Sequence, residues 1–133
     1  MCGIFGIAST KSIKNKLYQG LIKLEYRGYD SSGISGSDDS SKLTTIKATG
    51  PIKNLRTKLK TLTKITTGIA HTRWATHGEP ILKNTHPHLS ENISVVHNGI
   101  IENHIELRSL LKKKNYTFKS DTDSEAISHL IHM

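Results

Sequence analysis

The sequence begins Met1-Cys2-Gly3-Ile4-Phe5-Gly6-Ile7-Ala8. Small and large apolar residues alternate from Gly3 to Ala8, which predicts a buried strand that starts almost at the first residue. A chain end that is part of a sheet is ordered, whereas most chain ends fray. The strand would therefore hold Cys2, the single cysteine of the chain, in a fixed position.

Cys2 becomes the terminal residue if Met1 is removed, which occurs readily when the second residue is small. It then has a thiol and an amine on one residue. An unperturbed α-amino group titrates near pH ~7.7 to 8.0 and a thiol near ~8.5, so the amine can act as the base for the thiol. The alternative is a buried cysteine that packs as a small hydrophobe. A lone cysteine forms no internal disulfide, which agrees with a cytoplasmic location.

The apolar patterns that follow are typical of an α+β fold. Helical spacing predicts helices at 12–26, 51–62, 103–114 and 121–133. Strands are expected at 32–35, 43–48, 67–72 and 93–97, with a turn at 36–39 between the first two. The long polar stretch before 93–97 predicts a functional loop. The last helix has no stop signal, so the sequence looks cut short.

Composition narrows the classes of function. A chain of 133 residues is one domain at most, and 35% hydrophobic residues is typical of a globular protein. The formal net charge of +8 is compatible with a nucleic-acid partner. The lysines follow helical spacing, however, and no aromatic residues lie among them to stack on bases, so we expect solvated helix faces and no nucleic-acid binding. The first apolar run is too short for a signal sequence, and no membrane attachment is expected.

A second group of candidate residues is His71-Thr72-Arg73-Trp74-Ala75-Thr76-His77-Gly78, at the end of a predicted strand. The planar guanidinium of Arg73 suits a carboxylate ligand. The alternatives are that the His and Arg residues are structural hydrogen-bonding groups and that Trp74 serves packing. The chain has eight histidines, but only His86-Pro87-His88 has close spacing, so we expect no metal.

The pair Asn98-Gly99 follows a predicted strand, and this pair is the usual signature of a type I′ hairpin turn. The alternative is functional, since an Asn amide and a Gly N–H can both point at one oxygen, as an oxyanion hole requires. Asp121 and Asp123 have a simple structural interpretation as well. Acidic residues at these positions favour the start of a helix through capping and the helix dipole.

Five blocks across nearly the whole chain resemble a known family. They are Met1-Cys2-Gly3-Ile4-Phe5-Gly6-Ile7, Leu24-Glu25-Tyr26-Arg27-Gly28-Tyr29-Asp30-Ser31, Ala70-His71-Thr72-Arg73-Trp74-Ala75-Thr76-His77-Gly78-Glu79-Pro80, His86-Pro87-His88 and Val96-His97-Asn98-Gly99-Ile100-Ile101-Glu102-Asn103. Together they resemble the amino-terminal glutaminase domain of the glutamine:fructose-6-phosphate aminotransferases. Other amidotransferases with an N-terminal cysteine share the Cys-Gly-Ile start, and the block from His71 to Gly78 is the most specific.

The resemblance implies an N-terminal-nucleophile hydrolase fold, an αββα sandwich in which residues 1–133 form the incomplete first half of the domain. On this resemblance we expect the sugar isomerase domains of the family to be absent from residues 1–133. The resemblance also implies that L-glutamine is the substrate and that no cofactor is needed. Cys2 would be the nucleophile with its amine as acid and base, and Asn98 and Gly99 would form the oxyanion hole.

The resemblance further implies roles in substrate binding. Arg73 would bind the α-carboxylate of glutamine, Asp123 would bind its α-ammonium group, and Trp74 would help to close the path of ammonia. The remaining positions implied at the glutamine site are Thr76, His77, Gly78 and His86.

Two hypotheses follow. In the first, the chain is a glutaminase that works alone or with a separate chain that supplies the missing half-domain and the sugar isomerase part. In the second, the chain is a truncated, inactive remnant that needs a complementary chain to fold or act. In neither case do we expect these residues alone to complete glucosamine 6-phosphate synthesis.

Overall fold

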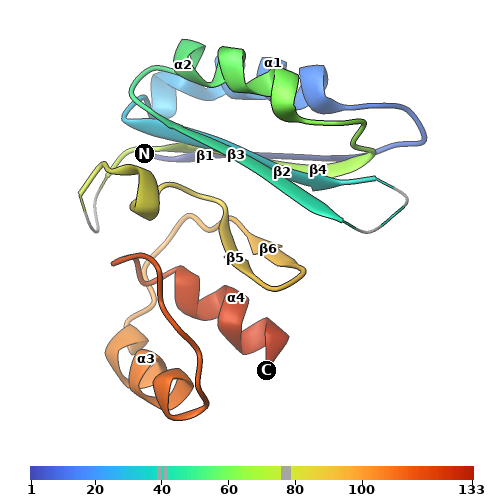
Figure 1. Cartoon of the computed structure of the whole chain (residues 1–133). Helices are drawn as coiled ribbons and strands as arrows, with labels where there is room; N and C mark the ends of the chain where they lie inside the picture. Colours follow the sequence, from blue (N-terminus) through green and yellow to red (C-terminus); the bar gives the residue numbers. More distant parts are fainter. Residues whose placement is uncertain (39, 41, 76–78) are drawn as a thin grey trace.

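The chain folds into layers in the order helix, sheet, sheet, helix (Figure 1). The structure is a computed structural model, and it describes residues 1–38, 40, 42–75 and 79–133. Helices α1 (Lys14–Leu24) and α2 (Lys53–Arg56) cover one face of a four-stranded sheet. The hairpin of β5 (His88–Ser90) and β6 (Ile93–Val95) lies on the other side of that sheet, and α3 (His104–Lys113) and α4 (Glu125–His132) lie beyond it.

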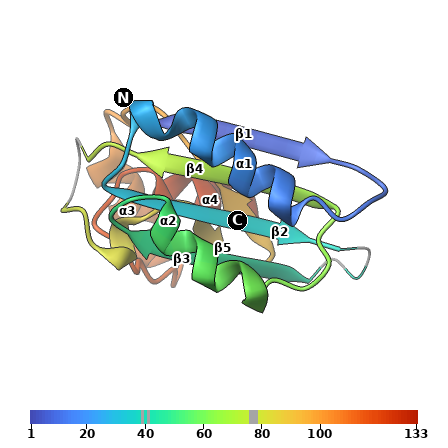
Figure 2. The same cartoon turned by 90° about the horizontal axis from the view of Figure 1, so that it is seen from above.

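The larger sheet is antiparallel throughout. Its strands lie in the order β1 (Gly3–Ala8), β4 (Thr67–Arg73), β2 (Ser31–Ser37) and β3 (Leu43–Thr49). Seen from above, α1 and α2 lie along these strands (Figure 2). Short 3₁₀ turns occur at Glu25–Arg27, Thr57–Thr61 and Leu82–Asn84.

The face of the sheet toward α1 and α2 carries the apolar core. Ile34 of β2 pairs with Ala70 of β4 and with Ile46 of β3, so the three side chains share one face. Helical spacing brings Leu17 and Leu21 of α1 onto the same core. Burial of each large apolar side chain stabilises the fold by about 1.5–3 kcal/mol.

The opposite face of the same strands is polar. Because side chains alternate along a strand, His71 and Arg73 point away from the core face that Ala70 occupies. Lys47 and His71 both lie beside Gly33 in the strand register, so they share the polar face. The space between the two sheets therefore holds charged and titratable groups, in contrast to the core.

Gly33 allows the two layers to approach closely. A Cβ atom added at Gly33 would lie 2.1 Å from the carbonyl oxygen of His86, which no side chain tolerates. The segment that contains His86 therefore crosses β2 at backbone distance. This approach brings the His86 ring to the neighbouring strand β4, where it stacks on His71.

The segment before α4 is fixed by two charged side chains. The guanidinium of Arg108 donates hydrogen bonds to the carbonyl oxygens of Ser120 and Thr122 at 2.8 and 3.0 Å and lies over the ring of Phe118. The buried carboxylate of Glu125 accepts hydrogen bonds from the backbone N–H groups of Lys119 and Ser120. These contacts hold the loop that precedes Asp123.

Most of the predicted elements are confirmed, and the exceptions have structural causes. The strand 3–8 forms, but β1 is an edge strand rather than a buried one, and Ile4 is 43% exposed. The polar stretch contains an unpredicted strand, β5, and the segment 51–62 becomes a 3₁₀ turn after Arg56. The last helix begins at Glu125 rather than at Asp121. Asp39 of the predicted turn lies outside the described residues.

Among the described residues, no helix is long and apolar enough to cross a bilayer.

Candidate active site

Cys2 lies directly before β1, at the end of the larger sheet. The pairing of Gly3 with Thr72 brings Cys2 beside Arg73. The backbone N–H of Trp74 donates to the Cys2 Sγ at 3.3 Å, and the thiol donates to the Trp74 carbonyl oxygen at 3.6 Å. The Arg27 Nε donates to the Cys2 carbonyl oxygen at 3.1 Å. The residue is thus held on both sides while its thiol stays partly exposed.

Arg73 is the last residue of β4 and is buried. Its Nη1 donates to the carbonyl oxygen of Glu79 at 3.0 Å, which ties the start of the long loop to the strand. Three predicted site residues, Thr76, His77 and Gly78, lie outside the described residues.

Trp74 follows Arg73, and its side chain is 45% exposed. Its ring meets the ring of Tyr29 edge to face, with centroids 5.4 Å apart. Trp74 therefore packs on one neighbour, Tyr29, but is not a buried core residue, because a large part of its side chain faces solvent. Asp30 holds the backbone nearby, since its carboxylate accepts a hydrogen bond from the N–H of Ala75.

Asn98 and Gly99 do not form a hairpin turn. A type I′ turn requires a positive φ at both central residues, and neither residue has one. Strand β6 ends at Val95, and the next element is α3. Both residues are exposed, but the Asn98 Oδ1 lies 2.8 Å from the Nε2 of buried His71. The turn is thus fixed by a contact to β4 rather than by strand pairing.

Asp123 is buried beside this segment. Its Oδ2 accepts a hydrogen bond from the Ile101 N–H at 2.6 Å, and its Oδ1 accepts one from the Ser124 hydroxyl at 3.3 Å. The Ser124 hydroxyl also contacts the Nδ1 of His97 at 3.0 Å. The helix-capping interpretation of Asp123 is wrong, because α4 begins two residues later and its N-cap makes no side-chain hydrogen bond.

Three buried histidines lie between the sheets. The rings of His71 and His86 stack with centroids 4.1 Å apart, and the ring of His88 meets His86 edge to face at 4.4 Å. The His88 Nε2 hydrogen-bonds to the Thr122 hydroxyl at 2.8 Å. Burial lowers the pKa of His71 to about 4 and that of His88 to about 3, and it holds the pKa of His86 well below its usual range. All three are neutral at neutral pH.

The described part of the chain contains no group of three or more His, Cys, Asp or Glu side chains arranged to hold a metal ion.

Several residues that hold the site together were not predicted. Asn84 is buried and bridges the long loop to the segment before α4, donating to the Glu79 carbonyl oxygen and accepting from the Asp121 N–H. Asp121 also pairs with Lys83. The two contacts of Asp121, with Asn84 and with Lys83, join residues 37 and 38 positions apart, and no local pattern encodes them. Of the arrangement of the site, the sequence indicates one feature. His71 and Arg73 are two positions apart on a predicted strand, so their side chains are expected on the same face.

The buried histidines should make the fold sensitive to acid. Their folded pKa values lie below the unfolded value of about 6.5, so the unfolded chain binds protons first as the pH falls. Stability should be full above about pH 6.5 and should decline toward about pH 4, with His71 alone contributing about 3 kcal/mol of the loss. Urea unfolding between about pH 7.5 and 4.5 would measure this decline. A stability that does not change over this range would contradict it.

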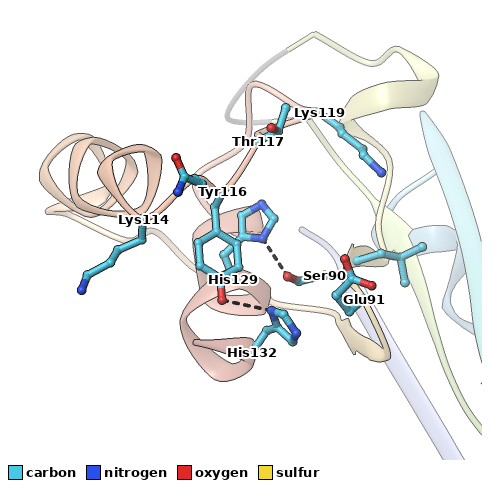
Figure 3. A pocket seen from close by; sticks show the side chains of 10 residues that line it. Ser90, Glu91, Lys114, Tyr116, Thr117, Lys119, His129 and His132 are labelled. Atoms are coloured by element: carbon cyan, nitrogen blue, oxygen red, sulfur yellow. Dashed lines mark hydrogen bonds between the residues drawn. The ribbon is translucent and has the colours of Figure 1, made fainter.

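A separate hollow of about 570 Å³ lies beside α4 (Figure 3), and Cys2 is not among the described residues that line it. Tyr116 and His132 are hydrogen-bonded to each other on its wall, and His129 contacts Ser90. None of its described lining residues belongs to the predicted glutamine site.

Comparison with known proteins points to one family. Residues 71–133 match the family described as glutamine amidotransferase domain. The glutamine–fructose-6-phosphate aminotransferase (isomerizing) of Wigglesworthia glossinidia brevipalpis is 56% identical over 137 residues, covering 99% of this chain and 22% of that protein. The protein of the same name from Buchnera aphidicola (Acyrthosiphon pisum) is 52% identical over 135 residues, with the same coverage.

Solved structures give the same class. The glutamine phosphoribosylpyrophosphate (PRPP) amidotransferase from B. subtilis, complexed with ADP and GMP, superposes with a TM-score of 0.81 at 29% identity, over 99% of this chain and 29% of that chain. A structure described as the allosteric regulatory enzyme of purine biosynthesis superposes with a TM-score of 0.82 at 30% identity.

The layered fold and these matches show that the chain belongs to the glutamine amidotransferases with the N-terminal-nucleophile hydrolase fold. Within that class, its sequence matches the amino-terminal region of the glutamine–fructose-6-phosphate aminotransferases. The chain spans 22% of the length of these curated relatives. The predicted fold class is therefore confirmed.

Proposed function

We propose that the chain hydrolyses the side-chain amide of L-glutamine to glutamate and ammonia, with Cys2 as the nucleophile after removal of Met1. The ammonia would serve the synthesis of glucosamine 6-phosphate from fructose 6-phosphate. The observation that carries the proposal is the position of the Cys2 thiol. It is partly exposed, held by the backbone of Trp74 and beside Arg73 at the end of β4.

The proposed reaction has two stages. The terminal amine takes the thiol proton, and the Cys2 sulfur attacks the amide carbon to form a tetrahedral oxyanion. The Asn98 side-chain amide and the Gly99 N–H stabilise this oxygen. The C–N bond then breaks as the terminal ammonium group protonates the departing nitrogen, which leaves ammonia and a glutamyl thioester. Water adds to the thioester carbonyl carbon, and cleavage of the C–S bond gives glutamate and the free thiol.

We assign substrate binding to two charged residues, Arg73 beside Cys2 and Asp123, which contacts Ile101 two residues after Gly99. Arg73 would bind the α-carboxylate through its planar guanidinium. Asp123 would bind the α-ammonium group, because a carboxylate that already accepts two hydrogen bonds has further acceptor capacity. Trp74 would help to close the path of ammonia. Two observations support this role: the Trp74 backbone contacts the thiol, and its side chain is exposed.

The remaining assignments are proposals of the same kind. Thr76, His77 and Gly78 would line the glutamine site. His86 would act on it indirectly, because its ring stacks on His71, which in turn contacts Asn98. Residues 1–133 would form part of one amidotransferase domain, and the transfer of ammonia to a sugar would require the further segments of the longer relatives, in the same chain or in a partner chain.

The experiment combines an activity assay with intact-mass measurement of the purified chain. We expect ammonia and glutamate to appear in equal amounts and the mass to correspond to loss of Met1. Full activity with Met1 still attached would contradict the role of the terminal amine. A chain that has lost Met1 and unfolds cooperatively, yet releases no ammonia, would contradict the proposed function. Loss of cooperative unfolding together with inactivity would favour the inactive remnant.

Two substitutions at Asp123 should separate its two contacts. Asp123→Asn keeps an acceptor for the Ile101 N–H but removes the charge, whereas Asp123→Ala removes both. We expect KM for glutamine to rise about 10- to 100-fold in both variants, since a charged hydrogen bond contributes about 1.5–3 kcal/mol. Only Asp123→Ala should also lower kcat, because it releases the segment of the oxyanion hole. Steady-state kinetics would test this, and equal kcat values for the two variants would argue against the structural contact.

A further inference from the structure

We infer that His71 is a positioning residue for the oxyanion hole, because its Nε2–H donates to the Asn98 Oδ1 and turns the amide nitrogen of Asn98 toward the substrate oxygen. The inference rests on the proposed glutaminase function. The contact joins a side chain that is 1% exposed to one that is exposed at the site, over 2.8 Å.

The hydrogen bond decides which end of the Asn98 amide faces the substrate. An Asn side chain offers an acceptor oxygen on one side and a donor nitrogen on the other, and a half-turn exchanges them. If the Nε2 of His71 carries the proton, only the Asn98 oxygen can face it, and the NH₂ group points to the site. If the proton were on Nδ1, the Asn98 amide would be reversed, and its oxygen would repel a developing oxyanion.

The surroundings of His71 favour the first arrangement. The ring has two polar neighbours, the Asn98 Oδ1 and the backbone of His97. Its buried Nδ1 makes no hydrogen bond of acceptable geometry among the described residues, so a proton there would be left unsatisfied. The same proton on Nε2 is bonded to Asn98. The imidazole is neutral at neutral pH, because burial holds its pKa near 4, and a neutral ring carries one such proton.

The orientation of the ring is itself fixed. The His86 ring stacks on His71 at 4.1 Å, and it reaches this place because β2 has a glycine, Gly33, where the His86 backbone crosses. His88 packs edge to face on His86 and is anchored by the Thr122 hydroxyl. This stack leaves His71 little freedom to rotate, so its Nε2 stays directed at Asn98.

Three variants at position 71 test the role. In Gln the amide nitrogen lies about as far from the backbone as the Nε2 of His, whereas in Asn it lies about as far as Nδ1. We expect His71→Gln to keep kcat for glutamine within about fivefold, and His71→Asn and His71→Leu to lose about 10- to 100-fold in kcat with KM little changed. In an Asn98→Ala background, His71→Leu should add no further loss of kcat.

A matched control is His129→Leu. His129 is also buried and also uses a ring nitrogen to contact a side chain, the Ser90 hydroxyl at 2.8 Å, but it lies in the other hollow. This variant should lose stability and keep kcat. A folded His71→Leu chain with wild-type kcat would overturn the inference, as would an equal kcat loss in His129→Leu.

A second measurement tests the hydrogen bond directly and does not depend on catalytic activity. Nitrogen-15 NMR of the histidine-labelled chain reports which ring nitrogen of His71 carries the proton. We expect the Nε2–H form in the wild-type chain and a shifted Nε2–H signal in Asn98→Ala. An Nδ1–H form would overturn the inference even if the chain is a glutaminase. If the chain releases no ammonia but shows the Nε2–H form and this shift, the proposed function fails while the hydrogen bond on which the positioning role depends is supported.

Discussion

Cys2→Ala should leave a folded chain that releases no measurable ammonia from glutamine. Removing the nucleophile of a covalent mechanism costs about 10⁴-fold or more in rate. Alanine and serine are both small, so Cys2→Ala and Cys2→Ser should lose Met1 as the parent chain does. The terminal amine is then unchanged, and the comparison isolates the sulfur.

The fold should tolerate this change. The Cys2 Sγ contacts the backbone of Trp74, whereas the Gly3 N–H and the Cys2 carbonyl oxygen hold the strand through Thr72 and Arg27. The unfolding free energy should therefore change by less than about 1 kcal/mol. An electrophilic glutamine analogue should add its mass to the parent chain and not to Cys2→Ala. Hydrolysis at a rate near that of the parent chain would exclude Cys2 as the nucleophile.

Asn98→Ala should lower kcat about 100- to 1000-fold, since loss of one oxyanion donor typically costs that much. It should also destabilise the fold by about 1–3 kcal/mol, because it leaves the buried Nε2–H of His71 without its partner. Kinetics and urea unfolding of the same preparation would measure both effects. An unchanged rate would rule out the assignment of Asn98 to the oxyanion hole.

Asn98→Asp provides the matched comparison. A carboxylate still accepts the His71 hydrogen bond but has no N–H to donate to the substrate oxygen. We therefore expect this variant to retain more stability than Asn98→Ala and to lose at least as much kcat. If Asn98→Asp were active and Asn98→Ala inactive, the effect of Asn98 would be structural rather than catalytic.

Strands and helices could be predicted where the apolar residues repeat over a segment long enough to show the period of a strand or of a helix. Strands β2, β3 and β4 have seven residues each, and their alternation gives their location. Strand β5 has three residues, too few for a period, and was not predicted. The edge position of β1 was also not predicted, because alternation carries no information on the order of strands in a sheet.

The site was predictable only in its parts. The residue types of Cys2, Arg73 and Asn98 indicate a chemistry, and the resemblance assigns their roles, which remain predictions. The contacts that position them join distant segments, such as His71 with Asn98 and Ile101 with Asp123. The local preference of Asn-Gly for a hairpin turn was overridden by these contacts, since local propensity is weaker than tertiary packing.

Strand β4 has two faces with separate tasks. Ala70 belongs to the apolar core, whereas His71 and Arg73 lie on the opposite, polar face, which carries the proposed chemistry. Because neighbouring residues of a strand point in opposite directions, a substitution at one position leaves the adjacent task almost untouched. Substitutions on the helix-facing side of this sheet can therefore raise thermal stability and leave the proposed active site unchanged. Substitutions on the polar face can change the proposed site and leave the core unchanged.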